Sequence, residues 1–144
     1  MIIRDLQASD LPGLLETLAN LSKVVEMPPE RLAEIFEEIQ NNPRHFIFVA
    51  VDDEIGVIGT ITLLIERKFI RDGALVGHIE DVAVRNNLEG KGIGGQLVKH
   101  AVQKAASEGC YKVILDCSEK NVSFYKKCGF KEREIEMRMD LPGV

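Results

Sequence analysis

The stretch HIEDVAVRNNLEGKGIGGQ, residues 78–96, decides the fold of this chain. It begins with an apolar, β-branched run that carries two adjacent carboxylates, and such a run is typical of a strand. A short loop follows, and then glycines open a segment with apolar residues at helical spacing. The stretch therefore predicts a strand, a loop and a helix, with a candidate anion site at the start of the helix and acidic groups beside it.

The glycine run GKGIGG at residues 90–95 lies where the predicted helix begins. A helix N-terminus offers unpaired N–H groups and a partial positive charge, and glycine lets a phosphate come close to the backbone. The run therefore predicts a cradle for a phosphate or pyrophosphate. A plain loop that leads into a helix is the alternative.

Two better-known phosphate motifs are excluded by context. The run satisfies G-x-G-x-x-G, and Asp116 follows about 20 residues later, as in a dinucleotide fingerprint. However, five residues separate Val84 from Gly90, and the chain predicts only one βαβ unit, where a dinucleotide fold needs two halves. A P-loop fails because no Gly-Lys-Ser/Thr sequence ends the run.

Glu80 and Asp81 are consecutive in the predicted strand. In a regular strand they point to opposite faces, and a carboxylate buried without a partner is strongly destabilising. Either one of them lies on a solvated face, or the strand borders a polar cleft, and a β-bulge would aim both into one site. Asp116 lies at the end of the next parallel strand, where ligands bind in open α/β sheets. The three carboxylates are candidate catalytic groups.

Asn121 and Tyr125, in the sequence NVSFY, are four residues apart and share one face of a short helix. A tyrosine has an ordinary pKa of about 10 and can give a proton to a leaving group. The alternative is a core tyrosine with a satisfied hydroxyl group. His45, His78 and His100 have no metal-ligand spacing, so we predict no metal and no role for them.

The rest of the chain predicts one α/β domain over residues 1–144, because no repeat, low-complexity segment or linker divides it. Strands are expected from Ile2, at 46–51, 57–65, 75–84 and 113–117 (the last of these buried), and at 130–139. Helices are expected after an N-cap at Ser9, from the two prolines at 28–29 to Asn41 with an apolar face over 32–39, from the glycine run to Gly109, and at 121–127. This order predicts a mixed, mostly antiparallel sheet with one βαβ crossover and helices on both faces.

Composition limits the class of protein further. The net charge of −5 and the pI of about 5.3 argue against broad nucleic-acid binding through a basic surface. No apolar run approaches the roughly 18 residues of a membrane span, and the N-terminal residues lack the apolar core of a signal peptide. Three cysteines without a CxxC pair suit a reducing compartment. We expect a cytoplasmic enzyme or binding domain.

Two segments resemble the GNAT acetyltransferases. The loop EGKGIG, after a strand that ends in DVAV, is similar to the acyl-CoA pyrophosphate loop of that family, and NVSFY followed by CGF is similar to its second signature. The segments IERK, GHIEDVAV and GCYKVILDCSEKNVSFYKKCGF are closest to family members that act on an amino-sugar phosphate. The resemblance implies acetyl transfer from acetyl-CoA to the 2-amino group of glucosamine 6-phosphate. It also implies a homodimer whose C-terminal strand contributes to the neighbouring active site.

The resemblance implies roles for individual residues as well. Acetyl-CoA would be bound at its pantetheine arm by Val82, Ala83 and Val84, at its pyrophosphate by Glu89, Gly90, Lys91, Gly92, Ile93 and Gly94, and near its thioester by Asn121 and Tyr125. The sugar phosphate would be surrounded by Glu80, Asp81, Leu115 and Asp116 at its amine and by Ser22, Lys68, Phe69, Ile70 and Arg71 at its phosphate. Glu80 would help to remove the ammonium proton, and Tyr125 would protonate the departing CoA thiolate.

Two positions depart from the family pattern. The pyrophosphate loop begins with Glu89, where the family usually has Gln or Arg, so only the backbone N–H of this residue is expected to serve the phosphate. The family enzyme places an arginine of the partner subunit near the sugar phosphate, and the corresponding position here is Asp140, with Arg133 and Arg138 nearby.

Two alternative functions stay open at this point. One is a GNAT enzyme that acetylates another amine, such as a polyamine or a peptide N-terminus, although Lys68 and Arg71 favour a phosphorylated acceptor. The other is a CoA-binding module without turnover, against which Tyr125 and the three carboxylates argue.

Overall fold

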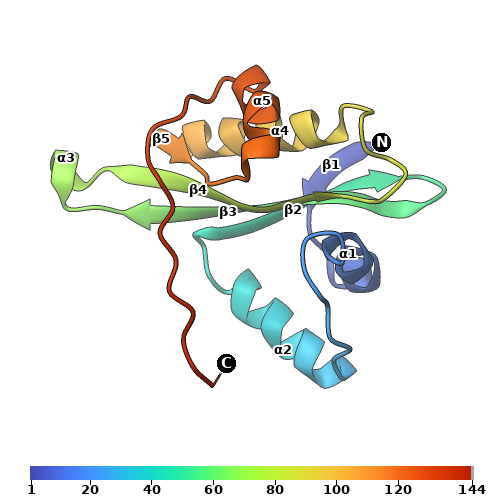
Figure 1. Ribbon diagram of the computed structural model, residues 1–144. Helices are drawn as coiled ribbons and strands as arrows, with labels where there is room; N and C mark the ends of the chain where they lie inside the picture. Colours follow the sequence, from blue (N-terminus) through green and yellow to red (C-terminus); the bar gives the residue numbers. More distant parts are fainter. Residues whose placement is uncertain (144) are drawn as a thin grey trace.

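A single five-stranded sheet forms the centre of the computed structural model, which describes residues 1–143 (Figure 1). The strands lie in chain order across the sheet, antiparallel except for the last two, which are parallel. The elements are β1 (Ile2–Asp5), α1 (Leu11–Leu18), α2 (Pro29–Gln40), β2 (His45–Asp52), β3 (Gly56–Arg67), α3 (Ile70–Gly73), β4 (Leu75–Val84), α4 (Ile93–Ser107), β5 (Cys110–Ile114) and α5 (Val122–Lys127), with 3₁₀ turns at Ala8–Asp10 and Glu119–Asn121. None of the helices in the described range is long and apolar enough to cross a membrane.

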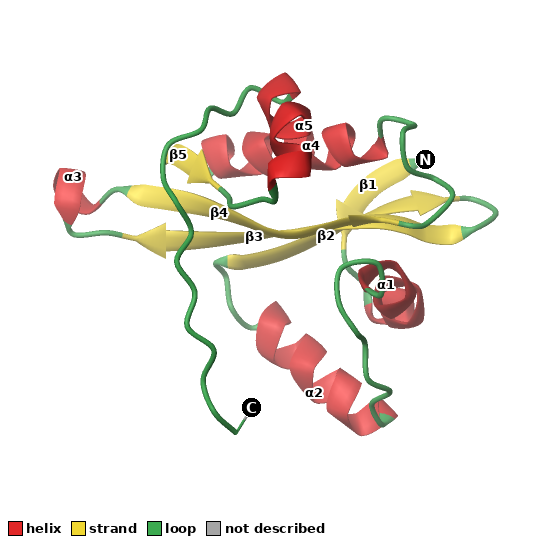
Figure 2. Ribbon diagram, in the orientation of Figure 1, coloured by secondary structure: helices red, strands yellow, loops and turns green. Residues whose placement is uncertain are grey.

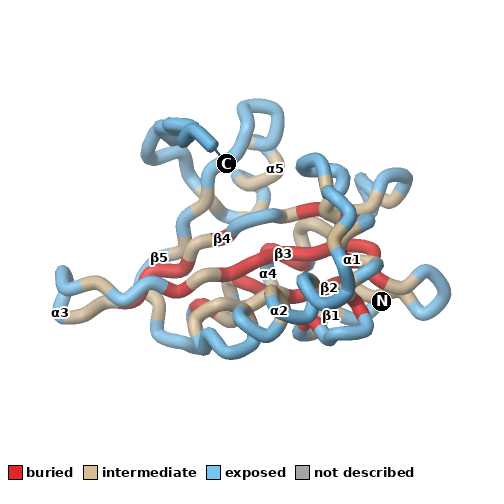
Figure 3. The backbone as a smooth tube through the Cα atoms, turned by 90° about the horizontal axis from the view of Figure 1, so that it is seen from below, coloured by how far each residue is buried: buried red, intermediate tan, exposed pale blue. Residues whose placement is uncertain are grey.

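Helices cover both faces of the sheet: α1 and α2 lie on one face, and α4 and α5 on the other (Figure 1). Ile61 and Leu63 of β3 belong to the larger core cluster together with Leu97 of α4, while Val57 packs with Leu14 of α1 in a second cluster. Figure 3 shows the buried backbone along the middle strands and an exposed C-terminal segment. The predicted α/β class, mixed sheet and two helical layers are confirmed.

The crossover helix α4 packs closely on the sheet because two glycines leave room for it. A Cβ atom at Gly59 of β3 would lie 2.9 Å from Cδ1 of Leu97, and one at Gly77 of β4 would lie 3.2 Å from Cβ of Ala105. Leu97 and Ala105 are fully buried. A side chain at either glycine would push the helix away, so this packing fixes where the first turn of α4 lies relative to β4.

The predicted strand at residues 130–139 is wrong. This segment forms neither strand nor helix, and it passes the edge of the sheet beside β5 as an open chain (Figure 2). Apolar residues do alternate in it, but no part of the described chain packs on them: Ile135, Met137, Met139 and Leu141 are 86, 88, 83 and 68% exposed. A strand needs a neighbour for its backbone groups, and this chain by itself does not supply one there.

Two further expectations are corrected. Strand β5 begins earlier than predicted and is largely exposed, because it is the edge strand of the sheet. Ser9 is not the N-cap of the first helix, since the 3₁₀ turn already starts at Ala8. The carboxylate of Asp10 instead accepts a hydrogen bond from the backbone N–H of Gln7, at 2.8 Å.

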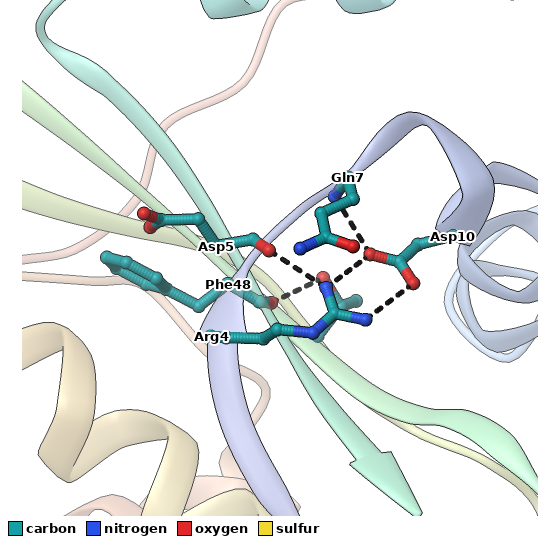
Figure 4. Close-up of polar contacts among 6 residues, drawn as sticks. Arg4, Asp5, Gln7, Asp10 and Phe48 are labelled. Carbon is teal, nitrogen blue, oxygen red and sulfur yellow. Dashed lines mark hydrogen bonds and ion pairs between the residues drawn. The ribbon is translucent and has the colours of Figure 1, made fainter.

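A buried ion pair ties the first strand to the first helix. Asp10 is 8% exposed and accepts hydrogen bonds from both terminal nitrogens of the Arg4 guanidinium, at 2.6 and 3.0 Å (Figure 4). Arg4 also donates to the backbone carbonyl of Asp5, at 3.0 Å. The hydrogen bonds from Arg4 lower the pKa of Asp10, against the opposing effect of burial. The pair fixes the direction in which the chain leaves β1 toward α1.

Asp10→Asn is expected to lower the free energy of unfolding by about 1–3 kcal/mol at neutral pH, because it leaves the Arg4 charge without its partner. Because the pKa of Asp10 is lowered in the folded state, its contribution is present above the unfolded pKa of about 3.9 and is lost as the pH falls through the folded pKa. Urea unfolding across this pH range measures both effects. Asp5→Asn, at an exposed carboxylate beside the same arginine, is the control and should change stability by less than about 0.5 kcal/mol; equal losses in the two variants would contradict the assignment.

Candidate active site

A β-bulge in β4 brings the acidic residues to one place. Thr60 of β3 pairs with Ala83, but Thr62 pairs with Glu80, so β4 has one residue more than β3 between these pairs. Asp81, inside the bulge, has a φ of 47°, in the left-handed region that aspartate tolerates better than most L residues. A bulge bends its strand and interrupts the alternation of side chains. As a result both Glu80 and Asp81 are exposed.

Glu80 lines a groove between β5, α5 and the C-terminal segment, together with Leu115, Asp116 and Tyr125. Burial raises the pKa of Glu80, and the negative charges of Asp116 and Asp81 raise it further. A carboxylate with a raised pKa is a better proton acceptor near neutral pH. The structure thus brings the three predicted carboxylates and the predicted tyrosine together.

Strands β4 and β5 separate at this site. Their pairing ends at His78 and Ile114, so residues 79–84 of β4 have no strand beside them on that side within the described chain. An extended arm that carries amide groups can bind such an edge as an added strand does. One carbonyl there, that of Val84, accepts a hydrogen bond from the side chain of Asn20, at 2.5 Å. The residues predicted to bind pantetheine all lie in this unpaired part of β4: Val82, Ala83 and Val84.

The glycine run forms a tight loop that ends at the first turn of α4. Gly90 and Gly92 have φ values of 79° and 82°, and a Cβ atom at either position would meet no other atom within 4 Å. Ile93 is buried, so only its backbone faces a ligand. The unpaired N–H groups of the first turn and its partial positive charge fit a pyrophosphate. The residues predicted to hold that group surround this turn: Glu89, Gly90, Lys91, Gly92, Ile93 and Gly94.

Tyr125 of α5 is held by aromatic contacts, with ring centroids 4.9 Å from that of Phe124 and 6.1 Å from that of Phe130. Burial, with smaller contributions from neighbouring thiols and Asp116, raises the pKa of Tyr125 to about 12. The hydroxyl group therefore keeps its proton at neutral pH. Burial also raises the pKa of the Cys128 thiol in the same groove, so a thiolate formed there is a stronger base than in water. Tyr125 is thus a protonated hydroxyl group in the groove that can act as a proton donor.

The residues predicted to bind the sugar phosphate are not gathered at the bulge. The segment from Lys68 to Arg71 connects β3 to β4 through α3, at the end of the hairpin away from the bulge (Figure 1). The strand from Leu75 to Glu80 alone covers roughly 16 Å. Phe69 and Ile70 are exposed, and Ser22 follows α1 in another part of the chain. Their contacts with a phosphate stay predictions.

Two of these cations already have partners in the single chain. The ammonium nitrogen of Lys68 is 3.0 Å from a carboxylate oxygen of Glu66. The guanidinium carbon of Arg71 lies 4.3 Å from the ring centroid of Tyr111 in β5. A phosphate that binds here has to compete with these contacts or share them.

His78 is a site residue that the sequence reasoning missed. It lines the groove two residues before Glu80, and its Nε2 lies 2.9 Å from a carboxylate oxygen of Glu66. The signal was available, because residues two apart in a strand share a face. Glu136 of the C-terminal segment was missed too, and its charge also raises the pKa of Glu80. Within residues 1–143, no group of three or more His, Cys, Asp or Glu side chains is arranged to hold a metal ion.

An extended, amide-containing arm that ends in a pyrophosphate fits the open edge of β4 and the glycine loop together. The fold and the site therefore define a CoA-dependent acyltransferase. Comparison with known protein families agrees: residues 12–130 match the family described as Acetyltransferase (GNAT) family. The chain belongs to this family and is an acetyl-CoA-dependent N-acetyltransferase.

Several relatives are similar to this chain over nearly its whole length. The glucosamine 6-phosphate N-acetyltransferase of Trypanosoma brucei brucei is 39% identical over 140 residues, 96% of this chain and 95% of that protein. Glucosamine 6-phosphate N-acetyltransferase 1 of Dictyostelium discoideum is 39% identical over 132 residues, 90% of this chain and 83% of that protein. The crystal structure of glucosamine-6-phosphate N-acetyltransferase from Arabidopsis thaliana matches with a TM-score of 0.94 and 37% identity, over 96% of this chain and 97% of that one.

Tyr125→Phe is expected to lower the turnover of acetyl transfer by about a hundredfold while the affinity for acetyl-CoA changes less than about twofold, because the ring stays and only the proton donor is lost. Thiol release and binding calorimetry measure the two quantities. The control is Tyr111→Phe, at the other tyrosine of the chain, which keeps the ring under Arg71. Unchanged turnover in the Tyr125 variant, or an equal loss in both variants, would show that Tyr125 is not the proton donor.

Proposed function

We propose that this protein transfers the acetyl group of acetyl-CoA to the 2-amino group of glucosamine 6-phosphate. The observation that carries the proposal is the cluster of Glu80, Asp81 and Asp116 beside the open edge of β4. Such a cluster attracts an ammonium group and can then accept its proton. The relatives named above support the amino-sugar phosphate as the acceptor.

The first step is the removal of a proton from the acceptor. An ammonium group has no free electron pair, so it cannot attack a thioester until it is deprotonated. Glu80 takes this proton, directly or through a water molecule, because its pKa is raised and it lies in the groove. Asp81 and Asp116 accept hydrogen bonds from the remaining N–H groups and orient the amine.

The second step is the transfer itself. The amine nitrogen forms a bond to the carbonyl carbon of the acetyl group, and negative charge develops on the carbonyl oxygen. A backbone N–H of the unpaired part of β4 stabilises that charge. The C–S bond then breaks, and the thiolate takes the proton of Tyr125, whose pKa of about 12 keeps the hydroxyl protonated beforehand. The nitrogen, which became positively charged when it attacked, loses its second proton to give the neutral amide, and this proton restores the Tyr125 hydroxyl group.

A homodimer is part of the proposal. In the C-terminal segment every second residue from Ile135 to Leu141 is apolar and exposed, which is the pattern of a strand with one face meant for burial. The outer edge of β5 has no strand beside it within residues 1–143. A second copy offers both a partner for this strand and a cover for its apolar face.

Such a dimer also bears on which cation meets the sugar phosphate. Arg133 lines the groove that contains Glu80. Arg138 is bonded instead to Asp140, with 2.7 Å between Nη2 and the carboxylate oxygen. Arg133 is therefore the better candidate of the two.

The reaction is proposed to take place in the cytoplasm. The thiols of Cys110, Cys117 and Cys128 are free, and Cys117 is exposed. Free thiols of this kind suit a reducing compartment.

Met137→Lys is expected to raise the dissociation constant of the dimer at least about tenfold, because it places a charge on the face that the second copy covers. Glu134→Lys, in the same exposed segment but on the other face of the alternation, is the control and should leave the dimer intact. Sedimentation at several protein concentrations measures both. A monomeric parent protein, or equal weakening in the two variants, would rule out this mode of assembly.

The acceptor is tested by measuring the release of CoA thiol with different amines. The kcat/KM for glucosamine 6-phosphate is expected to exceed that for unphosphorylated glucosamine by at least about a hundredfold. Without the phosphate, the cations of the site have no anionic partner in the transition state, and this raises the barrier for the unphosphorylated sugar. Equal kcat/KM values for the two sugars would contradict the proposal that the site recognises a phosphate. Faster release with spermidine would favour a polyamine acetyltransferase, and tight binding of acetyl-CoA without acceptor-dependent release would favour a CoA-binding module.

Asp116→Asn is expected to move the acidic limb of the pH–kcat/KM profile to lower pH. Glu80 works as the carboxylate, so activity falls as the pH drops through the pKa of Glu80. The charge of Asp116 raises that pKa, and its removal lowers it. Asp140→Asn, a carboxylate outside the groove, is the control for the loss of one negative charge. An acidic limb that does not move, or moves equally in both variants, would show that Glu80 is not the base.

A further inference from the structure

A row of polar side chains crosses from the end of β3 to the middle of β4. The row runs from Lys68 through Glu66 and His78 to Glu80. His78 and Glu80 are two residues apart in β4 and therefore share a face of the sheet. Glu66 of β3 pairs with Val76, so it is the diagonal neighbour of His78. Hydrogen-bond donors thus alternate with carboxylates over a short distance.

One carboxylate, that of Glu66, holds the two donors of this row. Its Oε2 lies 3.0 Å from the ammonium nitrogen of Lys68, and its Oε1 lies 2.9 Å from Nε2 of His78. The hydrogen bonds from Lys68 and His78 lower the pKa of Glu66, so it is ionised at neutral pH. A carboxylate only accepts hydrogen bonds, so the hydrogen of the imidazole is on Nε2. Two N–H donors are therefore fixed around one anionic group.

This arrangement changes where the ammonium of Lys68 acts. The backbone of Lys68 lies near the tip of the hairpin, far from the bulge, but its side chain is drawn back to Glu66 and so toward His78. The side chains of Lys68, Glu66 and His78 are all partly open to solvent, and His78 lines the groove that contains Glu80. An anion that enters the groove can therefore reach both donors.

We propose that Nε2–H of His78 and the ammonium of Lys68 bind the phosphate of the acceptor, and that Glu66 holds both donors until the phosphate replaces it. The inference rests on the proposed acceptor, an amino-sugar phosphate. The amine and the phosphate of this acceptor are attached at opposite ends of one sugar ring. His78 and Glu80 are about 7 Å apart along the strand, so the ammonium group meets Glu80 while the phosphate meets His78. A phosphate dianion carries more charge than a carboxylate and offers more acceptor oxygens, so it can displace Glu66.

The first test compares kcat/KM for glucosamine 6-phosphate with kcat/KM for glucosamine. In His78→Phe, which keeps a ring but has no N–H, the ratio is expected to fall about tenfold. In His78→Gln, whose amide N–H lies near the position of Nε2, the ratio is expected to stay within about threefold of the wild-type value. His45→Phe, the same replacement in β2 outside the groove, is the control and should leave the ratio unchanged. A mere structural tie between β3 and β4 would affect both sugars equally, because partial unfolding cancels in the ratio.

The second test uses glucose 6-phosphate as an inhibitor that competes with the acceptor. It has the phosphate but no amine, so its binding reports the phosphate contacts without the chemistry at Glu80. Its inhibition constant is expected to rise about tenfold in His78→Phe. In Glu66→Gln the inhibition constant is expected to fall by about three- to fivefold, because the negative charge that competes with the phosphate is removed.

The outcomes separate this inference from the proposed function. If the wild-type protein uses both sugars with equal kcat/KM, the proposed acceptor fails and the inference fails with it. If the wild-type protein prefers the phosphorylated sugar and His78→Phe keeps that preference, the acceptor stands and the inference alone is overturned. An equal fall of the ratio in His45→Phe, or an inhibition constant that does not change in His78→Phe, would also overturn it. Weaker inhibition in Glu66→Gln would show that the phosphate does not replace Glu66.

Discussion

The extra residue of β4 at Asp81 is the constraint on which the site depends. Without it, Glu80 and Asp81 would point to opposite faces of the sheet, and one of them would meet the core. A left-handed residue other than glycine costs about 1–2 kcal/mol, and here the paired residues of β3 on either side hold it in place. Strand β4 also continues beyond the end of its pairing with β5, so the carboxylates and the unpaired backbone edge lie next to each other.

The donor site depends on the same strand through the packing of α4. Gly59 and Gly77 let the helix lie close to the sheet, so its first turn has a fixed position relative to the end of β4. The glycine loop that joins the end of β4 to α4 is short, and its positive φ values turn the chain tightly into the helix. The phosphate cradle and the acidic cluster therefore belong to one strand–loop–helix unit. Loss of close packing under α4 would misplace one with respect to the other.

Most of the fold and part of the site could be predicted from the sequence. Residues 78–96 carry local signals, namely β-branched residues for the strand and glycines at a helix start, and such signals do not depend on distant partners. The bulge could be named only as an alternative, because it depends on how Thr60 and Thr62 of β3 align with β4. His78 could have been found from its spacing to Glu80. The position of the segment that contains Lys68, far from the bulge, could not be predicted, because the distance between them depends on the length of β4.

The wrong strand at residues 130–139 has a different cause. The alternation of apolar and charged residues is a property of the segment, whereas the pairing that makes it a strand is a property of its surroundings. Ile135 and Met137 are exposed because nothing in the described chain covers them. The alternation alone therefore does not make a strand, because the described chain supplies no neighbouring strand for the backbone of this segment.

The two charges of the proposed acceptor call for two different kinds of recognition. Glu80 lies among like charges, which draw in an ammonium group but repel a phosphate. The phosphate of an amino-sugar phosphate must therefore meet cations placed away from the bulge. In the single chain Lys68 is already paired with Glu66, whereas Arg133 is carried into the groove by the uncovered C-terminal segment. The amine and the phosphate of the proposed acceptor would thus be recognised by different segments of the chain, the bulge of β4 and the C-terminal segment.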